Sequence, residues 1–289
     1  MRLPLVSVII PTFNSSKLLE KTLRSVISQS YKNLEIIIID DGSSDETEFV
    51  VNQLMLTDNR IRYIQRSKNS NLPAVARNNG IENCKGEYIA FLDHDDLWVR
   101  KKIEREISFL EKYKSVGLVH SCFLTFGTLN PFALLRSIPG LSDRNATAKT
   151  LEERNMIICS SVVVRRDLIL KLNGFDERLE LRAVEDFALW REVVKLAPII
   201  YLPEVHGFYR QSSLGTLASE NLTIRWDIVD RTIGSQLSNW KYRRSKFRAI
   251  HRILSFPLSI YIHLIEGELR KILNIEPRIS KFYKLRALV

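Results

Sequence analysis

The chain of 289 residues is poor in cysteine, with three in all. Cys84, Cys122 and Cys159 are odd in number, far apart and without a CxxC spacing. This pattern argues against a disulfide framework and against a zinc site. We therefore expect reduced thiols and a cytoplasmic protein.

Long apolar runs, repeats and low-complexity segments are also absent from the sequence. No stretch approaches the roughly 20 apolar residues that cross a membrane. The N-terminal stretch MRLPLVSVIIPTFN carries one positive charge and no small-residue cleavage site. We interpret it as a first β-strand and not as a signal peptide. With 45% hydrophobic residues, the chain can bury a sizeable core.

The net charge of +10 is distributed unevenly along the chain. Residues 221–289 hold 14 basic and 5 acidic side chains, which leaves 29 basic and 28 acidic side chains in residues 1–220. A nearly neutral body argues against nucleic-acid binding, because that function needs a basic surface. We predict a catalytic domain over 1–220 and a basic, helical C-terminal extension over 221–289.

Apolar runs alternate with helical patterns through the first 120 residues. Strands are predicted at Leu5–Ile10, Leu34–Ile39, Ile61–Ile64, Tyr88–Leu92 and Val116–Ser121. Helices are predicted after Asn14, from a capping-box-like pair at Asp45 and Glu48, over Ala74–Glu82 and over Val99–Lys112. This alternation indicates an α/β domain with a mainly parallel central sheet and flanking helices.

Carboxylates gather where the predicted strands end. Asp40 and Asp41 follow the second strand, and Asp93, Asp95 and Asp96 follow the fourth, in the sequence YIAFLDHDD. The segment 11–14 follows the first strand in the same way. Since parallel strands end at one edge of a sheet, and ligands bind beyond that edge, these segments predict a shared site.

Several carboxylates in one cleft repel each other unless a cation is present. Asp93, Asp95 and Asp96 supply hard oxygen ligands suited to Mg²⁺ or Mn²⁺, ions that also bind the oxygens of a diphosphate. The alternative is a solvated loop, because Asp favours turns and caps. His94 is either a further ligand or a spacer between the acids.

Six motifs, in order and in register, resemble those of the family-two glycosyltransferases. They are VSVIIPTFN, LEIIIIDDGSSDET, ARNNGI, GEYIAFLDHDD, NGFDERL and EDFALW, and together they extend over roughly residues 5–210. The resemblance implies a GT-A fold, a Rossmann-like nucleotide-binding half, a nucleotide-sugar donor, Mn²⁺ or Mg²⁺ as cofactor and an inverting reaction.

The resemblance also implies a role for each matching residue. The residues expected around the nucleotide-sugar are Pro11, Thr12, Asn14, Asp40, Asp41, Arg77, Asp93 and Arg210. Asp41 would accept from the base, Asp40 would shape its turn and Asp93 would approach the ribose. Asp95 would hold the metal, with Asp96 supporting it. Arg77 would lie near the phosphates or tether the acidic loop; alternatively, it is a surface helix residue paired with a Glu.

Asp186 matches the catalytic base of the family, with Glu185 as the second candidate. An acceptor hydroxyl is a poor nucleophile, so a positioned base should remove its proton. The apolar spacing after Asp186 predicts a helix that begins there, and a first-turn acid also complements the helix dipole without any catalytic role. That dipole lowers the pKa of Asp186, whereas neighbouring acids raise it.

The match weakens in two places. No His follows the Tyr209-Arg210 pair, so the expected contact with the diphosphate rests on Arg210, or on Gln211, Ser212 or Ser213. Residues 123–155, where acceptor recognition is expected, carry no chemistry-bearing motif. In NGFDERL, we expect Asp176 to be structural.

The basic extension has two interpretations. Residues 241–289 mix basic clusters with apolar runs, which fits an interfacial helix on anionic lipid. The same pattern fits a helix packed on the catalytic domain. The first interpretation places the protein in the cytoplasm and peripherally on the cytoplasmic face of the inner membrane.

The favoured function is transfer of a sugar from a nucleotide donor, a UDP-sugar in the first place, to a glycan or lipid-linked glycan in cell-surface polysaccharide synthesis. The alternatives are a sugar-nucleotide nucleotidyltransferase and a catalytically inactive, membrane-associated scaffold. Nucleotidyltransferases begin with a Gly-rich phosphate loop, which PTFNSSKLLE lacks. The intact acids at 41, 93, 95 and 186 argue against a scaffold.

Overall fold

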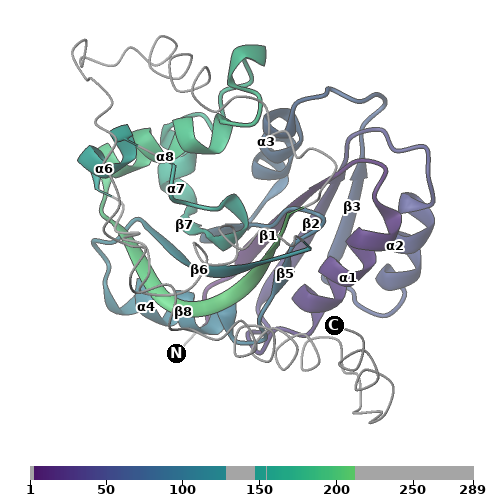
Figure 1. The fold of residues 1–289 in the computed structure, drawn as a ribbon. Helices are drawn as coiled ribbons and strands as arrows, with labels where there is room; N and C mark the ends of the chain where they lie inside the picture. The colour runs from purple at the N-terminus through teal and green to yellow at the C-terminus, as the bar shows by residue number, and fades with distance from the viewer. Residues whose placement is uncertain (1–2, 128–146, 154, 212–289) are drawn as a thin grey trace, which may run out of the picture.

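The structure, a computed structural model, describes residues 3–127, 147–153 and 155–211. One eight-stranded sheet runs through this part of the chain, with helices on both of its faces (Figure 1). The predicted extension over 221–289, including the membrane-contact segment 241–289, lies outside the described residues. So does most of the predicted acceptor segment 123–155.

The strand order of the sheet is β3-β2-β1-β4-β7-β6-β8-β5. The strands are β1 (Val6–Thr12), β2 (Leu34–Asp40), β3 (Ile61–Gln65), β4 (Tyr88–Phe91), β5 (Leu97–Trp98), β6 (Leu118–Phe126), β7 (Val163–Arg165) and β8 (Ile199–Arg210). The four strands β3, β2, β1 and β4 are parallel, as predicted. The other half is mixed: β7 is antiparallel to β4 and β6, β8 is parallel to β6, and β5 is antiparallel to β8.

Helices cover both faces of the sheet, and β1, β2 and β4 are buried along their whole length. The helices are α1 (Ser16–Ile27), α2 (Thr47–Met55), α3 (Pro73–Asn83), α4 (Lys102–Lys112), α6 (Ala148–Glu153), α7 (Arg166–Lys171) and α8 (Glu185–Leu196). Ile9 of β1 packs in the core that contains α8, whereas Val8 and Ile10 pack with Leu19 and Leu23 of α1. A continuous apolar strand is typical of a sheet buried on both faces.

Most predicted bounds of strands and helices agree with the structure to within one residue, and three elements differ by more. β1 continues through Pro11 to Thr12 beside β2. Proline lacks a backbone N–H, but β4 pairs with β1 only as far as Ile9, so no hydrogen bond to β4 is lost at Pro11. The helix predicted from Val99 begins at Lys102, because β5 ends at Trp98 and a turn separates it from the helix. The strand predicted at 116–121 runs from Leu118 to Phe126.

The capping box predicted at Asp45 and Glu48 is also absent. Glu46 is the N-cap of α2 and makes no side-chain cap hydrogen bond. The Asp45 carboxylate instead accepts from the backbone N–H of Ser16, at the start of α1, and from Thr47. Asp45 therefore joins the starts of two helices, which no local pattern could indicate.

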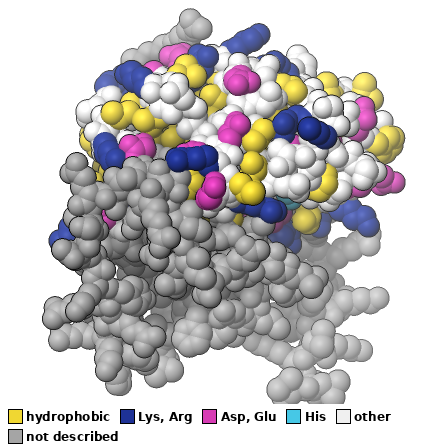
Figure 2. All heavy atoms as spheres, turned by 90° about the horizontal axis from the view of Figure 1, so that it is seen from above, with side chains coloured by type: hydrophobic (Ala, Val, Ile, Leu, Met, Phe, Trp, Pro, Cys, Tyr) yellow, Lys and Arg dark blue, Asp and Glu magenta, His cyan; other side chains and the backbone are white. Residues whose placement is uncertain are grey.

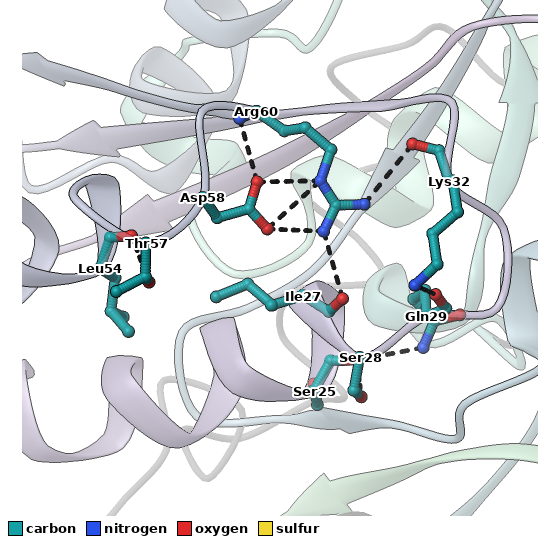
Figure 3. Close-up of polar contacts among 9 residues, drawn as sticks. All are labelled: Ser25, Ile27, Ser28, Gln29, Lys32, Leu54, Thr57, Asp58 and Arg60. Carbon is teal, nitrogen blue, oxygen red and sulfur yellow. Dashed lines mark hydrogen bonds and ion pairs between the residues drawn. The ribbon is translucent and has the colours of Figure 1, made fainter.

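Arg60 lies just before the start of β3 and joins it to the end of α1 (Figure 3). Its guanidinium pairs with Asp58 through Nε and Nη2, at 2.9 and 2.6 Å, and Nη2 also donates to the Ile27 carbonyl at 3.2 Å. Ile27 ends α1, so a cation lies where the helix dipole is negative. Hydrogen bonding and charge from Arg60 lower the pKa of Asp58. This ion pair holds α1 against the sheet.

The described surface carries both signs of charge. On the face shown in Figure 2, basic and acidic side chains are interspersed between apolar ones and do not gather in one patch. Among the described residues, no helix is both long enough and apolar enough to cross a membrane.

Candidate active site

The three predicted loops meet at one edge of the sheet. β1 and β2 pair in register, with Thr12 beside Asp40, and β1 pairs with β4 up to Ile9 beside Phe91. The segments that follow these three strands therefore emerge side by side at their carboxyl ends. The prediction of a shared edge is confirmed.

Asp40 shapes the turn after β2. It is fully buried, accepts from the Ser43 N–H at 2.8 Å and receives the hydroxyl of Tyr63. Burial, followed by the hydrogen bond to Asp40, raises the pKa of Tyr63, which keeps the phenol a donor. Gly42 has a φ of +81°, and a Cβ there would lie 2.9 Å from the backbone of Lys68 and Asn69. Only glycine fits this turn.

Asp41 connects the same turn to the segment after β3. Its side chain is buried, and its N–H donates to the Thr12 carbonyl at 2.9 Å. One carboxylate oxygen pairs with Arg66, and the other accepts from the N–H and hydroxyl of Ser70 at 2.9 and 2.8 Å. A carboxylate has about four lone-pair positions, so Asp41 retains capacity to accept from a ligand.

The β1–α1 loop is tied to the β2–α2 loop through Asn14. The backbone of Asn14 is left-handed, with a φ of 45°, which asparagine tolerates better than most residues. Its N–H donates to the Ser43 hydroxyl, and its side-chain oxygen accepts from the Ser44 N–H, both at 2.8 Å. The hydroxyl oxygen of Thr12 is buried and has no protein partner. This unpartnered oxygen points to a ligand or water beside the loop.

The acidic loop, residues 93–96, is held from three directions. The Asp93 N–H donates to the Ser160 hydroxyl at 3.0 Å, and the Asp93 carboxylate accepts from Arg77 at 2.8 Å. Asp96 is fully buried, and one of its oxygens accepts from the Arg210 N–H at 2.8 Å. Arg210 also donates through Nε to the Asp95 carbonyl at 3.2 Å.

Arg210, predicted at the nucleotide-sugar, therefore lies against the acidic loop. Its guanidinium stacks over the Phe126 ring, 4.5 Å from the centroid. These contacts join the end of β8 to the loop that follows β4. The missing His after Tyr209 leaves Arg210 as the only cation that the described part of β8 brings here.

The acidic loop is electrostatically unfavourable on its own. Burial raises the pKa of Asp95, Asp93 raises it further, and His94 opposes both. Burial raises the pKa of Asp96 well above its usual value, and Asp95 and Asp93 add to the effect. The second oxygen of Asp96 is buried without a partner. A cation beside these carboxylates would offset their burial and their mutual repulsion, and it would give the unpartnered oxygen of Asp96 a partner.

This donor set fits a divalent ion that shares its coordination with a substrate. Within the described ranges, no three His, Cys, Asp or Glu side chains are arranged as a preformed metal cage. Asp93 and Asp96 each have one oxygen engaged by other groups, which leaves few free protein ligands. Mg²⁺ and Mn²⁺ commonly bind through one or two carboxylates together with phosphate oxygens and water. The residues present are compatible with that mode.

Arg77 joins the acidic loop to the second half of the site. It is a buried residue of α3, and its two terminal nitrogens pair with Asp93 at 2.8 Å and with Glu185 at 2.6 Å. The interpretation of Arg77 as a surface residue was wrong, although its pairing with a glutamate is present. Arg77 thus tethers the loop and places a cation between two carboxylates.

Asp186 lies at the start of α8, one residue after Glu185, as the apolar spacing predicted. Burial and the adjacent Glu185 raise the pKa of Asp186 to about 7, against the opposing charge of Arg77. Burial and, after it, the charge of Glu185 therefore keep the pKa of Asp186 high although the residue lies in the first turn of a helix. Asn155 lies 3.5 Å from its carboxylate, and the Phe187 N–H donates to it at 2.6 Å. A carboxylate with this pKa can accept a proton near neutral pH.

The turn before α8 is strained. Ala183 has a φ of +66°, a left-handed conformation that costs about 1–2 kcal/mol in a residue with a Cβ. Strained residues of this kind occur preferentially beside functional groups. Ala183 sets the direction in which α8 begins and, with it, the position of Glu185 and Asp186.

The sequence did not indicate several residues that build the site. Ser160, in the 3-10 turn Cys159–Ser161, holds Asp93 by its hydroxyl and accepts from Trp98 Nε1 at 2.9 Å through its carbonyl. Tyr63, Arg66 and Ser70 hold Asp40 and Asp41 at the end of β2. None belongs to a local motif, and each contacts a partner at least 23 residues away.

Comparison with known proteins identifies the family of the chain. The family model for glycosyl transferase family 2 matches residues 7–172. A putative teichuronic acid biosynthesis glycosyltransferase of Bacillus subtilis is 32% identical over 200 residues, which are 66% of this chain and 73% of the relative. The UDP-Glc:alpha-D-GlcNAc-diphosphoundecaprenol beta-1,3-glucosyltransferase of Escherichia coli is 29% identical over 82% of this chain and 90% of its own length.

Solved structures share the fold. The structure of Staphylococcus aureus TarS 1–349 in complex with UDP-GlcNAc superposes with a TM-score of 0.65 at 20% identity, over 79% of this chain and 65% of that one. The mannosyltransferase PcManGT of Pyrobaculum calidifontis, in complex with GDP-Man and Mn²⁺, superposes with a TM-score of 0.63 at 21% identity, over 99% and 79%. With its GT-A architecture and a family match across more than half of its length, the chain belongs to glycosyl transferase family 2 and is a glycosyltransferase.

Proposed function

We propose that this enzyme transfers a sugar from a nucleoside diphosphate sugar, a UDP-sugar in the first place, to a hydroxyl of a lipid-linked glycan in cell-envelope polysaccharide synthesis. One observation carries the proposal. Arg77 pairs with Asp93 at the donor side and with Glu185, beside Asp186, so that one buried cation serves both halves of the reaction. The printed name of the E. coli relative, with a UDP-sugar donor and a diphosphoundecaprenol acceptor, supports the substrate classes.

The base of the donor would bind beside Asp41 and the loop that contains Thr12 and Asn14. Asp41 would accept an N–H of the base, and Arg66 would donate to an adjacent carbonyl. Uracil and guanine both present such an edge, so nucleotide specificity needs a direct test. Pro11 and Asp40 would act through the backbone that they hold, and Asp93 would accept from the ribose.

Asp95 would hold the divalent ion, with Asp96 and Asp93 completing its protein side. Bound there, Mn²⁺ or Mg²⁺ would neutralise the charge that develops on the leaving diphosphate. Arg77 and Arg210 hold the backbone and carboxylates of this loop in place, so little rearrangement is needed when the donor arrives. The raised pKa values of Asp95 and Asp96 support a cation-dependent loop.

Asp186 would take the proton of the acceptor hydroxyl as that oxygen attacks the sugar from the face opposite the diphosphate. A single displacement of this kind inverts the anomeric centre. Glu185 would be a positioning residue, because its side chain is buried and bound to Arg77. Reaction with a lipid-linked acceptor would place the enzyme peripherally on the cytoplasmic face of the inner membrane.

The first test is a thermal-shift panel of UDP, GDP, dTDP and CMP, each with and without Mn²⁺ or Mg²⁺. Saturation at about 100 Kd adds about 2.7 kcal/mol to the free energy of unfolding. We expect metal-dependent stabilisation by UDP in the wild type and none in Asp95→Ala. Asp167→Ala, an exposed acid on α7, is the matched control and should respond like the wild type.

Two results would contradict the donor site. One is a wild type that no nucleotide stabilises, and the other is an Asp95→Ala protein that responds as the wild type does. Stabilisation by GDP alone would retain the site and change the nucleotide. Proton NMR of the glycosylated product then tests inversion through the anomeric coupling constant.

A further inference from the structure

His94, between the acids of the loop, contacts the loop that follows β1. Its Nε2 lies 2.9 Å from the Ser15 hydroxyl, and its Nδ1 lies 3.3 Å from the Pro11 carbonyl oxygen. The ring therefore bridges the acidic loop and the β1–α1 loop, 79 residues apart in sequence. The proposed function assigns no role to the His94 side chain.

The chemistry of the two partners defines the bridge. The Pro11 carbonyl can only accept, so Nδ1 must carry a hydrogen. The Ser15 hydroxyl can donate to Nε2 or accept from it, depending on whether the ring is neutral or charged. Both contacts are thus compatible with either form of the ring, and the bridge needs no particular protonation state.

The Ser15 hydroxyl contacts His94 and does not cap the helix that follows it. Ser15 is the N-cap residue of α1, a position where serine normally caps the helix with its hydroxyl. Here the hydroxyl makes no cap hydrogen bond and lies 2.9 Å from both His94 Nε2 and the Phe13 carbonyl oxygen. Its single hydrogen goes to Nε2 when that nitrogen is an acceptor and to the Phe13 carbonyl when Nε2 carries a hydrogen.

The backbone around His94 is held as firmly as its ring. The Thr22 hydroxyl of α1 lies 2.8 Å from the His94 carbonyl and 2.9 Å from that of Asp96. On the other side, Asn14 binds Ser43 and Ser44 of the β2–α2 loop, as described above. A chain of hydrogen bonds thus runs from the turn of Asp41, through the β1–α1 loop, to the acidic loop.

We propose that His94 is a positioning residue that fixes the separation between the nucleoside-binding loops and the acidic loop, so that a nucleoside diphosphate and its metal bind together. This inference rests on the proposed function for the identity of the ligand. The bridge itself is a property of the free protein. Removing the ring should therefore loosen both loops and weaken binding of the complete nucleotide–metal pair.

The first experiment measures hydrogen exchange in the ligand-free protein. In His94→Ala and in Ser15→Ala, amides in peptides covering 12–17 and 92–97 should exchange several-fold faster, about fivefold for the loss of one hydrogen bond. The double variant should exchange no faster than His94→Ala. Ser28→Ala, at the other end of α1 and with one hydroxyl bond to a carbonyl, is the matched control.

The second experiment measures the Kd of UDP in the presence of Mn²⁺ by calorimetry. We expect His94→Ala to raise the Kd about tenfold, and Ser28→Ala to leave it unchanged. His94→Gln can place its amide nitrogen near the position of Nε2, so it should restore binding to within about twofold. His94→Asn reaches only toward Pro11 and should restore less.

The outcomes separate this inference from the proposed function. Unchanged exchange in His94→Ala overturns the bridge, whatever UDP does. Altered exchange with an unchanged Kd, or a Gln variant as weak as Ala, overturns the positioning role. A wild type that binds neither UDP nor another nucleotide with metal overturns the proposed function, while the exchange data still decide the bridge.

Discussion

Asp186→Asn should lower kcat and raise the free energy of unfolding, so it separates the catalytic role of Asp186 from its effect on stability. Asparagine keeps the shape of the side chain but accepts no proton. The loss of a general base lowers kcat by about 10²–10⁴. Binding of the donor should remain unchanged, because the proposed nucleotide and metal contacts lie at the ends of β1, β2 and β4.

The pH dependence of the wild type follows from the pKa of Asp186, about 7. The base must be ionised, so kcat/KM should rise about tenfold per pH unit below 7 and level off above 8. In Asp186→Asn this rise should disappear. Purified enzyme with a saturating lipid-linked acceptor and a coupled assay for released nucleotide would measure both profiles.

Stability should change in the opposite direction. The folded protein holds the Asp186 proton to a higher pH than the unfolded chain does, so this group destabilises the fold as pH rises from about 4 through 7. The difference from the ordinary value of 3.8 corresponds to at most about 4 kcal/mol, and partial exposure to solvent reduces it. We expect Asp186→Asn to be about 1–2 kcal/mol more stable than the wild type at pH 8 and equal to it near pH 4, by urea denaturation.

The control for this prediction is Asp167→Asn. Asp167 is also an acid in the first turn of a helix, α7, but it is exposed and outside the site. If first-turn acids serve only the helix dipole, the two variants should behave alike. An Asp186→Asn enzyme with more than a tenth of the wild-type kcat, or with the wild-type pH profile, would refute the assignment of the base.

Three further substitutions test the packing around the site by urea denaturation. Arg77→Met leaves two carboxylates without their shared cation and should cost about 3–5 kcal/mol, and a loss below 1 kcal/mol would contradict the buried bridge. Lys102→Met should cost about 1–3 kcal/mol, because it removes the 2.6 Å ion pair of the fully buried Glu106 and leaves His206, at 2.8 Å, as the remaining partner of that carboxylate. An unchanged midpoint would contradict this contribution. Gly80→Ala places a methyl group 2.4 Å from the Ile9 side chain and should cost about 1–3 kcal/mol, unless α3 can shift away from β1.

The parallel half of the fold could be predicted because its strands are buried on both faces. Such strands contain continuous apolar runs, as in residues 8–11 of β1 and 36–39 of β2. The other half could not. β5 has two residues and β7 has three, and each pairs with a strand far away in sequence, so neither leaves a periodic pattern.

The acids of the site could be predicted from their position, but their partners could not. The end of an apolar run is a local signal, and it indicated Asp41 and Asp93. Arg66 and Ser160, which hold these two residues, are ordinary polar residues whose roles arise only from the tertiary structure. The pKa of Asp186 likewise depends on burial and on Glu185 in three dimensions, so the direction of its shift could not be decided from the sequence.

The pairing of β5 with β8 has a consequence for the order in which the enzyme matures. Leu97 pairs with Phe208, and Asp96 receives the N–H of Arg210, 114 residues later in the chain. The β1, β2 and β4 strands can assemble as soon as they leave the ribosome, whereas these contacts must wait for β8. Non-local contacts form slowly, and their loop must close first. A nascent or truncated chain that ends before residue 207 would therefore present its acids without their final partner, and the enzyme gains a complete site only when nearly all of its catalytic domain has been made.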